Sequence, residues 1–182
     1  MPALTVYCSS SNHVDLRFTE TAAEVGRAIA ERGWSLVYGG NAVGCMGAVA
    51  DAVRGGKGKV VGITPMLFDE SILDRAADEL LIADNMRHRK HELEARGDAF
   101  LTLPGGLGTF EEFFEIAVGR VLNAHAKPVV LLNVHDFYTP LLRTIDAGID
   151  DGFIKPEAWA KVHVAETVTD AFTQLEAELS SD

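Results

Sequence analysis

The sequence predicts an α/β protein in which helices cover both faces of a doubly wound, mostly parallel sheet. Three observations predict this class. Short apolar runs bounded by turn residues alternate with segments in which apolar residues recur at three- and four-residue spacing, as on one face of a helix. Two of the apolar runs lead directly into glycine-rich turns, and the chain has no internal repeat. Such an alternation of strand and helix requires right-handed crossovers, which bring the strand ends to one shared edge.

The predicted strands are short apolar segments that end next to turn residues. In chain order they cover residues 4–8, 34–38, 60–65, 80–83, 98–103, 129–133 and 162–164. Runs of this length suit buried strands better than helices. The stretch after the third strand, to about Asp78, has no clean period, which is typical of a lid or a binding loop.

The predicted helices lie between these strands. Their periodic positions fall within residues 18–29, 46–53, 86–96, 110–122, 137–149 and 168–179. Gly33 ends the first helix, and Asp84 or Asn85 caps the third, because glycine suits a helix end and a short polar side chain suits a helix start. The expected architecture is one Rossmann-like domain spanning residues 1–182, which buries about 70% of the surface of the unfolded chain.

Composition excludes several classes of function. The net charge of −11 argues against binding to a nucleic-acid backbone, which requires clustered Lys and Arg. Hydrophobic residues make up 47% of the chain, yet no apolar run approaches the roughly 20 residues of a membrane span, so we expect a soluble protein with no membrane partner. No basic, signal-like segment opens the chain, which predicts the cytoplasm. In that reducing compartment Cys8 and Cys45 are expected to be small buried residues.

One segment organises the predicted site, and it reads Pro104-Gly105-Gly106-Leu107-Gly108-Thr109-Phe110-Glu111-Glu112. It lies where the fifth strand becomes a helix. Glycines there can take positive φ and let an anion approach the backbone, and the free N–H groups of a helix start attract negative charge. Thr109 either donates its hydroxyl to that anion or caps the helix. Glu111 and Glu112 either act beside a bound phosphate or merely stabilise the first helical turn.

The remaining polar motifs are open to two interpretations. Ser9 follows the first strand, where ligands usually bind, although serines are also common in turns, which is the interpretation favoured for Ser10. Arg87, Arg89 and Lys90 form either a solvated basic face or the local positive charge that a phosphate needs. An arginine in the first helical turn opposes the helix dipole, and such conflicts gather at functional sites.

Neither of two nucleotide-binding fingerprints is present, and we expect neither a metal nor another cofactor. The glycine-rich turn around Gly40 lacks the G-x-G-x-x-G spacing, and no G-x-x-x-x-G-K-[ST] sequence occurs. His88 and His91, with Glu92 beside them, are three residues apart. This spacing is common among exposed polar groups, so these residues are weak evidence for a metal site.

The P-G-G-x-G-T-x-x-E motif resembles that of the LOG (LONELY GUY) family of cytokinin riboside 5′-monophosphate phosphoribohydrolases. The matching segments follow one another in the family's order and spacing over nearly the whole chain. Besides the central motif they are Tyr38-Gly39-Gly40 with Gly44-Cys45-Met46-Gly47, Met86-Arg87-His88-Arg89-Lys90, and Lys127-Pro128-Val129 before Leu131-Leu132-Asn133.

The resemblance implies hydrolysis of the N-glycosidic bond of a nucleoside 5′-monophosphate, giving a free base and ribose 5-phosphate. It implies that Arg89 and Glu112 are catalytic and that the phosphate is held by Gly105, Gly106, Leu107, Gly108 and Thr109. Further substrate contacts are implied for Ser9, Gly40, Glu70, Met86, Lys90 and Glu111, with Asp69 as an alternative to Glu70. Similar proteins form homodimers, so we expect a homodimer.

The chain departs from the family pattern at two places. Asn41 stands where the family usually has a third glycine; Asn tolerates the left-handed conformation, so the turn is expected to survive with a changed approach to the ligand. Gly119, Val121 and Asn123 stand within a segment that usually reads T-W-x-Q-L-G, and this departure limits the prediction of substrate, because base preference or dimer packing is expected to differ. The alternatives are a general nucleoside 5′-monophosphate (AMP-type) nucleosidase and a non-catalytic nucleotide or molybdenum-cofactor carrier. Lysine decarboxylation, a common label for such proteins, needs a pyridoxal-phosphate lysine that the motifs do not indicate.

Overall fold

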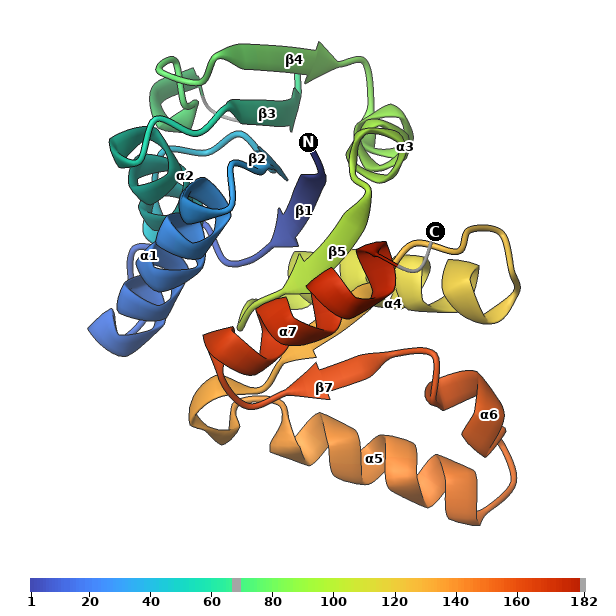
Figure 1. Cartoon of the computed structure of the whole chain (residues 1–182). Helices are drawn as coiled ribbons and strands as arrows, with labels where there is room; N and C mark the ends of the chain where they lie inside the picture. Colours follow the sequence, from blue (N-terminus) through green and yellow to red (C-terminus); the bar gives the residue numbers. More distant parts are fainter. Residues whose placement is uncertain (67–69, 181–182) are drawn as a thin grey trace.

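The computed structural model describes residues 1–66 and 70–180. Its strands form one parallel, seven-stranded sheet in the order β4-β3-β2-β1-β5-β6-β7 (Figure 1). The strands are β1 (Ala3–Tyr7), β2 (Ser35–Tyr38), β3 (Val60–Pro65), β4 (Glu79–Ala83), β5 (Ala99–Thr102), β6 (Val129–Leu132) and β7 (His163–Ala165). Every predicted strand is present, and no strand end moves by more than one residue. The sheet is parallel at every pairing, where the sequence predicted a mostly parallel one.

Helices alternate with these strands. They are α1 (Leu16–Glu31), α2 (Gly44–Gly55), α3 (Met86–Arg96), α4 (Leu107–Val121), α5 (Thr139–Asp150), α6 (Pro156–Trp159) and α7 (Val168–Leu179), with short 3-10 turns η1 (Glu70–Ile72) and η2 (Val134–Asp136). The short helix α6 was not predicted. In the described part of the chain, every helix is too short or too polar to cross a bilayer.

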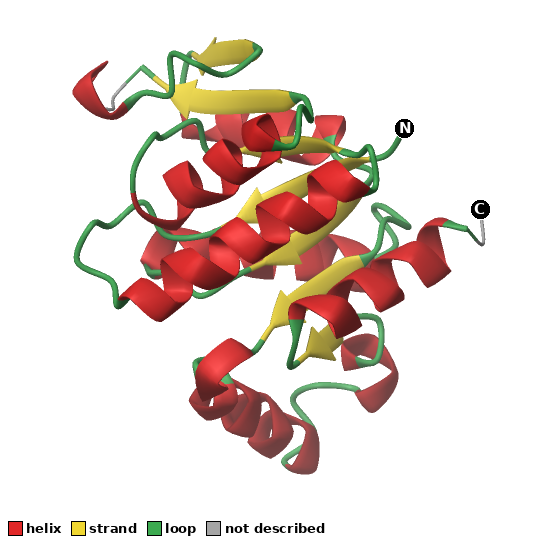
Figure 2. Ribbon diagram, turned by 60° about the vertical axis from the view of Figure 1, so that its left-hand side comes forward, coloured by secondary structure: helices red, strands yellow, loops and turns green. Residues whose placement is uncertain are grey.

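Two cores pack on opposite faces of the sheet because successive strand side chains point to opposite sides. Leu4 and Val6 of β1 join a cluster with α1, α2 and α7, whereas Tyr7 joins a second cluster with α3, α4 and α5. The two helical layers enclose the sheet (Figure 2). This confirms the doubly wound α/β architecture.

The order of the strands places the site. From β1 the chain builds outward through β2 and β3 to β4, and it then returns to pair β5 with the other side of β1. The winding direction reverses between β1 and β5. In open α/β sheets ligands bind outside the carboxyl ends of the strands at such a reversal. The loops after β1 and β5 are the serine-rich turn and the glycine-rich motif, so the fold brings the two predicted ligand segments together.

Candidate active site

A cavity of about 300 Å³ opens at the carboxyl edge of the sheet, between the loops after β1 and β2 and the first turns of α3 and α4. Its walls are formed by Cys8, Ser9, Ser10, Ser11, Asn41, Met46, Met86, Arg89, Gly106, Gly108, Thr109, Glu111 and Glu112. We call this cavity the edge pocket. It lies at the reversal of winding described above.

The edge pocket contains a buried ion pair. Arg89 Nη1 of α3 donates to Glu112 Oε1 of α4 at 2.6 Å, and the two side chains are 4% and 7% exposed. Arg89 Nε also donates to the carbonyl of Ile63 in β3 at 3.0 Å. Arg89 therefore lies buried in the pocket wall, which excludes for this residue the alternative of a solvated basic face. Arg87, two residues earlier, is exposed.

Burial raises the pKa of Glu112, and the neighbouring Arg89 guanidinium opposes that rise. A buried carboxylate is retained in a protein only with a charged partner or a function, because taking an unpaired charge out of water is costly. The pair thus holds one acidic side chain in a fixed orientation at the pocket wall.

The glycine before Gly40 explains how Arg89 reaches the site. A Cβ at Gly39 would overlap the Arg89 guanidinium and the Met46 side chain. Only glycine leaves room there for a large cation to pass the end of β2. Gly40 itself has φ +77° and packs against β3, so its role is to shape the turn, and it does not form part of the pocket wall.

The glycine-rich motif turns into α4 earlier than the sequence pattern predicted. The helix begins at Leu107 after Gly106, and no side chain caps it. Thr109 therefore lies inside the first turn, and the interpretation of Thr109 as a cap is wrong. Glu111 and Glu112 lie beyond that turn, which also excludes their first-turn role in stabilising the helix.

The start of α4 forms an open cradle. A Cβ at Gly106 or Gly108 would meet no atom within 4 Å, and both glycines line the pocket, so their backbone is accessible to a ligand. Gly105 differs, since a Cβ there would overlap the Thr109 side chain. Neither Gly105, Gly106 nor Gly108 has a positive φ. Gly106 and Gly108 thus allow a ligand to approach the backbone closely, and Gly105 leaves room for the Thr109 side chain. None of the three is needed for a left-handed conformation.

The two adjacent glutamates have different surroundings. Glu112 is buried, whereas Glu111 is exposed and accepts a hydrogen bond from Lys90 Nζ. Lys90 Nζ also pairs with Glu115 at 3.0 Å. The hydrogen bond to Glu111 raises the pKa of Lys90. Lys90 therefore joins α3 to α4 beside the pocket and does not line it.

The structure brings most of the predicted site residues together. Those in the wall of the edge pocket are Ser9, Met86, Arg89, Gly106, Gly108, Thr109, Glu111 and Glu112. Those outside it are Gly40, Lys90, Gly105 and Leu107, the last with its side chain 86% exposed. The prediction for Glu70 concerns a side chain outside the described part of the structure, and Asp69 also lies outside the described residues.

Sequence reasoning did not select five of the wall residues: Cys8, Ser10, Ser11, Asn41 and Met46. Cys8, Ser10 and Ser11 could have been identified from their position directly after β1, because the winding direction of the sheet reverses between β1 and β5. Ser9, which was left open between a ligand contact and a turn residue, has both features, because it lines the pocket and its Oγ accepts from the Ser11 N–H at 3.1 Å. Both cysteines are buried free thiols, as predicted.

Within the described residues, no group of three or more His, Cys, Asp or Glu side chains is arranged to hold a metal ion. His88 Nδ1 lies 3.5 Å from Asp84, and Nε2 lies 3.7 Å from Glu92, so the histidine bridges carboxylates along α3. Asn85 is the cap of that helix, since its Oδ1 accepts from the His88 N–H at 3.0 Å.

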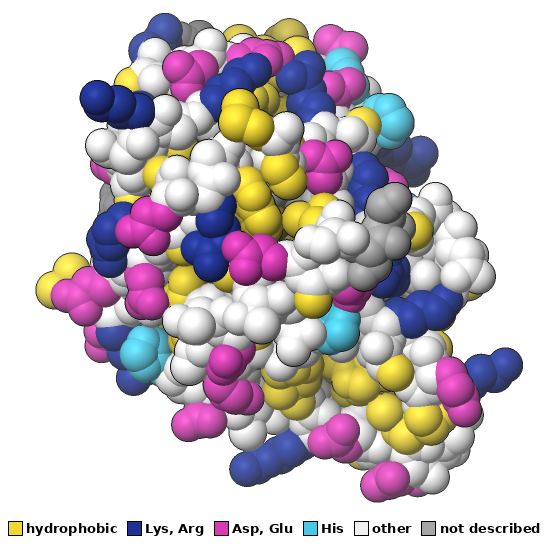
Figure 3. Space-filling view, viewed as in Figure 1, with side chains coloured by type: hydrophobic (Ala, Val, Ile, Leu, Met, Phe, Trp, Pro, Cys, Tyr) yellow, Lys and Arg dark blue, Asp and Glu magenta, His cyan; other side chains and the backbone are white. Residues whose placement is uncertain are grey.

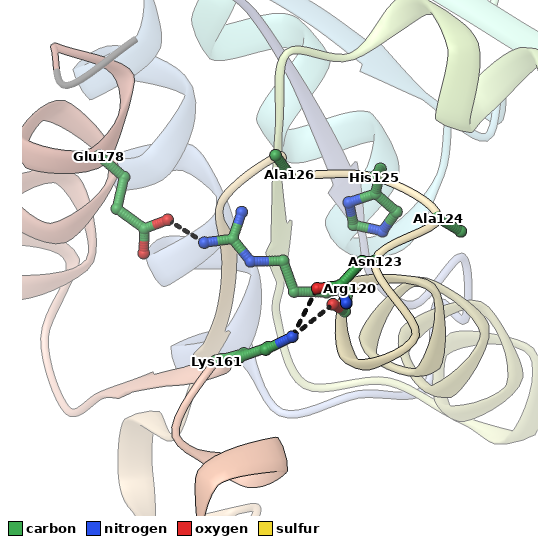
Figure 4. Close-up of a pocket in the computed structure, with 7 residues that line it drawn as sticks. All are labelled: Arg120, Asn123, Ala124, His125, Ala126, Lys161 and Glu178. Atoms are coloured by element: carbon green, nitrogen blue, oxygen red, sulfur yellow. Dashed lines mark hydrogen bonds and ion pairs between the residues drawn. The ribbon is translucent and has the colours of Figure 1, made fainter.

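A larger cavity, of about 660 Å³, lies at the opposite edge of the sheet, where α4 ends and β6 and β7 begin (Figure 4). Its charged groups are already paired. Arg120 donates to Glu178 at 2.5 Å, and Lys161 donates to Asn123 at 2.7 Å. Lys161 also donates to the Val121 carbonyl, so it caps the end of α4. Gly119 packs against His125. The departures at Gly119, Val121 and Asn123 therefore lie at the end of α4 remote from the edge pocket.

Charge on the visible face of the molecule is mixed. In Figure 3, Lys and Arg side chains are interspersed with acidic ones and do not form a continuous basic patch. The positive charge of the edge pocket comes instead from a single buried residue, Arg89, inside a chain of net charge −11.

Fold and pocket together define a doubly wound α/β protein with an open, glycine-lined helix start beside a buried Arg–Glu pair. A family model described as "Possible lysine decarboxylase" matches residues 46–175. The chain is 42% identical over 170 residues to a cytokinin riboside 5′-monophosphate phosphoribohydrolase from Mycobacterium tuberculosis, which covers 92% of this chain and 90% of that protein. It is 40% identical over 172 residues to a probable enzyme of the same name from Oryza sativa subsp. japonica, which covers 94% of this chain and 70% of that protein.

The chain belongs to this family of LOG-type proteins. Among solved structures, the molybdenum cofactor carrier protein from Chlamydomonas reinhardtii superimposes with a TM-score of 0.73 at 24% identity, covering 98% of each chain. At that identity the likeness shows a shared fold and nothing further. It agrees with the predicted Rossmann-like architecture.

Proposed function

We propose that this protein is a phosphoribohydrolase that cleaves the N-glycosidic bond of a nucleoside 5′-monophosphate, releasing the base and ribose 5-phosphate. The observation that carries the proposal is the juxtaposition, in one pocket, of the open glycine cradle at the start of α4 and the buried Arg89–Glu112 pair. The names of the relatives support the same reaction.

The 5′-phosphate would bind the free N–H groups at the start of α4 with the Thr109 hydroxyl, because a helix N-terminus favours an anion. Gly106 and Gly108 leave that backbone open. Fixing the phosphate orients the ribose relative to Glu112, which lies farther along the same helix.

Breaking the N-glycosidic bond gives the sugar oxocarbenium character at C1′. The Glu112 carboxylate would stabilise that positive charge or activate the attacking water. A guanidinium does not act as a proton donor in proteins, so the role of Arg89 is not to protonate the leaving base. Its role is to hold Glu112 in place and to keep it ionised inside the pocket.

Glu112→Gln and Arg89→Ala are each expected to lower kcat at least about 100-fold, since each removes charge stabilisation in the transition state. Base release from a nucleoside monophosphate measures the effect. Glu115→Gln is the matched control, because Glu115 lies on the same helix and pairs with Lys90 outside the pocket. Near wild-type turnover in Glu112→Gln, with the fold intact by circular dichroism, would refute the assignment.

The preferred base is tested by a panel of AMP, GMP, CMP and isopentenyladenosine monophosphate. Release of base from the isopentenyl nucleotide alone supports the cytokinin substrate. Equal release from AMP supports the general nucleosidase. A carrier would bind its ligand without releasing any base, and it would not need Arg89 and Glu112.

Lysine decarboxylation does not fit the pocket. That chemistry needs a lysine that forms a Schiff base with pyridoxal phosphate. Among the described residues that line the edge pocket there is no lysine, and nearby Lys90 is engaged by Glu111 and Glu115. We therefore derive no step through that cofactor.

The assembly state and location are part of the proposal. The outer face of α4 exposes Phe114, Val118 and Leu122, which follow one another at four-residue spacing. Such an apolar stripe on a helix that is buried on its other face favours contact with a second copy of the chain. We also keep the cytoplasm as the proposed location, where nucleoside monophosphates are available.

A further inference from the structure

We propose that Asn41 positions the substrate by binding the ribose 2′-hydroxyl, and that it thereby makes the enzyme selective for ribonucleotides. The inference rests on the proposed function. Asn41 lines the edge pocket, its side chain is 2% exposed, and its Oδ1 has no hydrogen-bond partner among the described residues. A buried carbonyl oxygen without a donor is destabilising, so such an atom at a pocket wall indicates that a ligand supplies the donor.

The backbone around Asn41 is held firmly. Asn41 forms a bridge with Leu73, and the flanking Ala42 N–H donates to the carbonyl of Ile72 at 2.8 Å. On the other side the Asp74 N–H donates to the carbonyl of Gly40 at 2.8 Å. Asp74 is itself fixed by Tyr38 Oη and Arg54. The amide is thus presented to the pocket from a rigid turn, as a preorganised binding group requires.

The chemistry of the unpaired atom limits its partner. An amide oxygen accepts hydrogen bonds, and phosphate oxygens at neutral pH also accept, so Asn41 Oδ1 cannot pair with the phosphate. The partner must carry a donor, which in a nucleotide is a sugar hydroxyl or an amino group of the base. A hydroxyl both donates and accepts, so it can use either atom of the amide.

The position of Asn41 selects the sugar. Asn41 follows β2, whereas the cradle follows β5 on the far side of β1, about 10 Å away at two strand spacings. The Arg89 guanidinium packs against Gly39, two residues before Asn41, and Arg89 forms an ion pair with Glu112. Asn41 therefore lies near the pair that faces C1′. The 2′-hydroxyl is on the carbon bonded to C1′, which makes it the nearest donor.

The test compares base release from AMP and from 2′-deoxy-AMP by the wild type, Asn41→Ala and Asn41→Gly. We expect either variant to lower kcat/KM for AMP by about tenfold while leaving 2′-deoxy-AMP nearly unchanged, because only AMP loses a hydrogen bond. The ratio of kcat/KM for AMP to kcat/KM for 2′-deoxy-AMP is compared between each variant and the wild type. The difference in intrinsic lability of the two glycosidic bonds cancels in this comparison. Asn123→Gly, the same change at a residue that lies outside the edge pocket and already has a positive φ, is the control and should keep the wild-type ratio.

The possible outcomes separate this inference from the proposed function. An active wild type whose ribose-to-deoxyribose ratio is unchanged in both folded variants overturns the inference and leaves the function standing. A variant that instead changes the ratio of AMP to IMP shows that Asn41 reads the base, which also overturns it. A wild type that releases base from no nucleotide in the panel refutes the proposed function itself. Thermal unfolding of each variant verifies that it is folded.

Discussion

At the scale of single residues, the site depends on one carboxylate whose environment differs from that of its sequence neighbour. Glu112 and Glu111 are adjacent in the chain, but one is buried against Arg89 and the other is exposed beside Lys90. Sequence alone left both with two interpretations, because the pattern does not tell how far along a helix a residue lies or which side chain meets a partner from another element. The match to known motifs singled out Glu112 and Arg89, and the geometry is consistent with that choice.

The raised pKa of Glu112 predicts the acid limb of the pH profile. In the proposed mechanism the ionised carboxylate is the active form, so we expect kcat/KM to fall as pH decreases through the pKa of Glu112. Because burial raises that pKa, the midpoint should lie above the value of about 4.3 for an ordinary glutamate. The pH dependence of base release measures it. A midpoint at or below the ordinary value would contradict the assignment.

Arg89 provides an internal check on the same titration. Since the guanidinium favours the ionised carboxylate, Arg89→Ala should raise the pKa of Glu112 further. Carbon-13 NMR of the Glu112 carboxyl group follows the titration directly, without relying on the low activity expected of this variant. An unchanged or lower pKa in Arg89→Ala would show that the two groups do not interact as the structure places them.

At the scale of elements, strand positions were predictable and the start of α4 was not. Each strand is a short apolar run between turn residues, and the five inner strands, β1, β2, β3, β5 and β6, are buried along nearly their whole length, which keeps that signal clear. At α4 the first turn consists of Leu107, Gly108 and Thr109, where an exposed leucine and a glycine hide the helical period. The periodic apolar pattern starts only at Phe110. Leu107 and Gly108 are exposed at the helix start, so they do not follow the core pattern.

Tyr138 contacts residues on both sides of the glycines in the glycine-rich motif. Its hydroxyl donates to the carbonyl of Leu103 at 2.7 Å, just before the motif, and its ring packs edge-on against Phe110. Tyr138→Phe keeps the ring and removes only the donor. We expect the free energy of unfolding to fall by about 1 kcal/mol, because a buried carbonyl loses its partner.

The same substitution should affect substrate binding more than chemistry. Without this hydrogen bond the glycine-rich motif is less well fixed, and the proposed binding of the phosphate weakens. KM should therefore rise several-fold while kcat changes less. Urea denaturation and steady-state base release give the two quantities. Phe137→Leu serves as the control, because Phe137 packs on Tyr138 yet has no bond to the motif. Unchanged stability and KM in Tyr138→Phe would mean that the hydroxyl does not anchor the glycine-rich motif.

At the scale of the whole molecule, α4 is apolar on two sides. Its inner face contributes Phe113, Ile116 and Ala117 to the core, and its outer face leaves Val118 51% exposed and Leu122 71% exposed. A helix that is fully part of one core has no need of a second apolar face. We therefore expect that face to contact a second copy of the chain, as proposed above.

Val118→Glu tests that assembly. A charge at the centre of a self-complementary contact is introduced twice, once from each copy, so the two carboxylates repel each other and must lose water. We expect the mass measured by light scattering to change from that of a dimer to that of a monomer at micromolar concentration. Leu16→Glu is the matched control, since Leu16 is a comparably exposed apolar residue at the start of α1, and it should leave the dimer intact. A wild type that is already monomeric, or a Val118→Glu dimer as tight as the wild type, would show that the α4 stripe is not the contact.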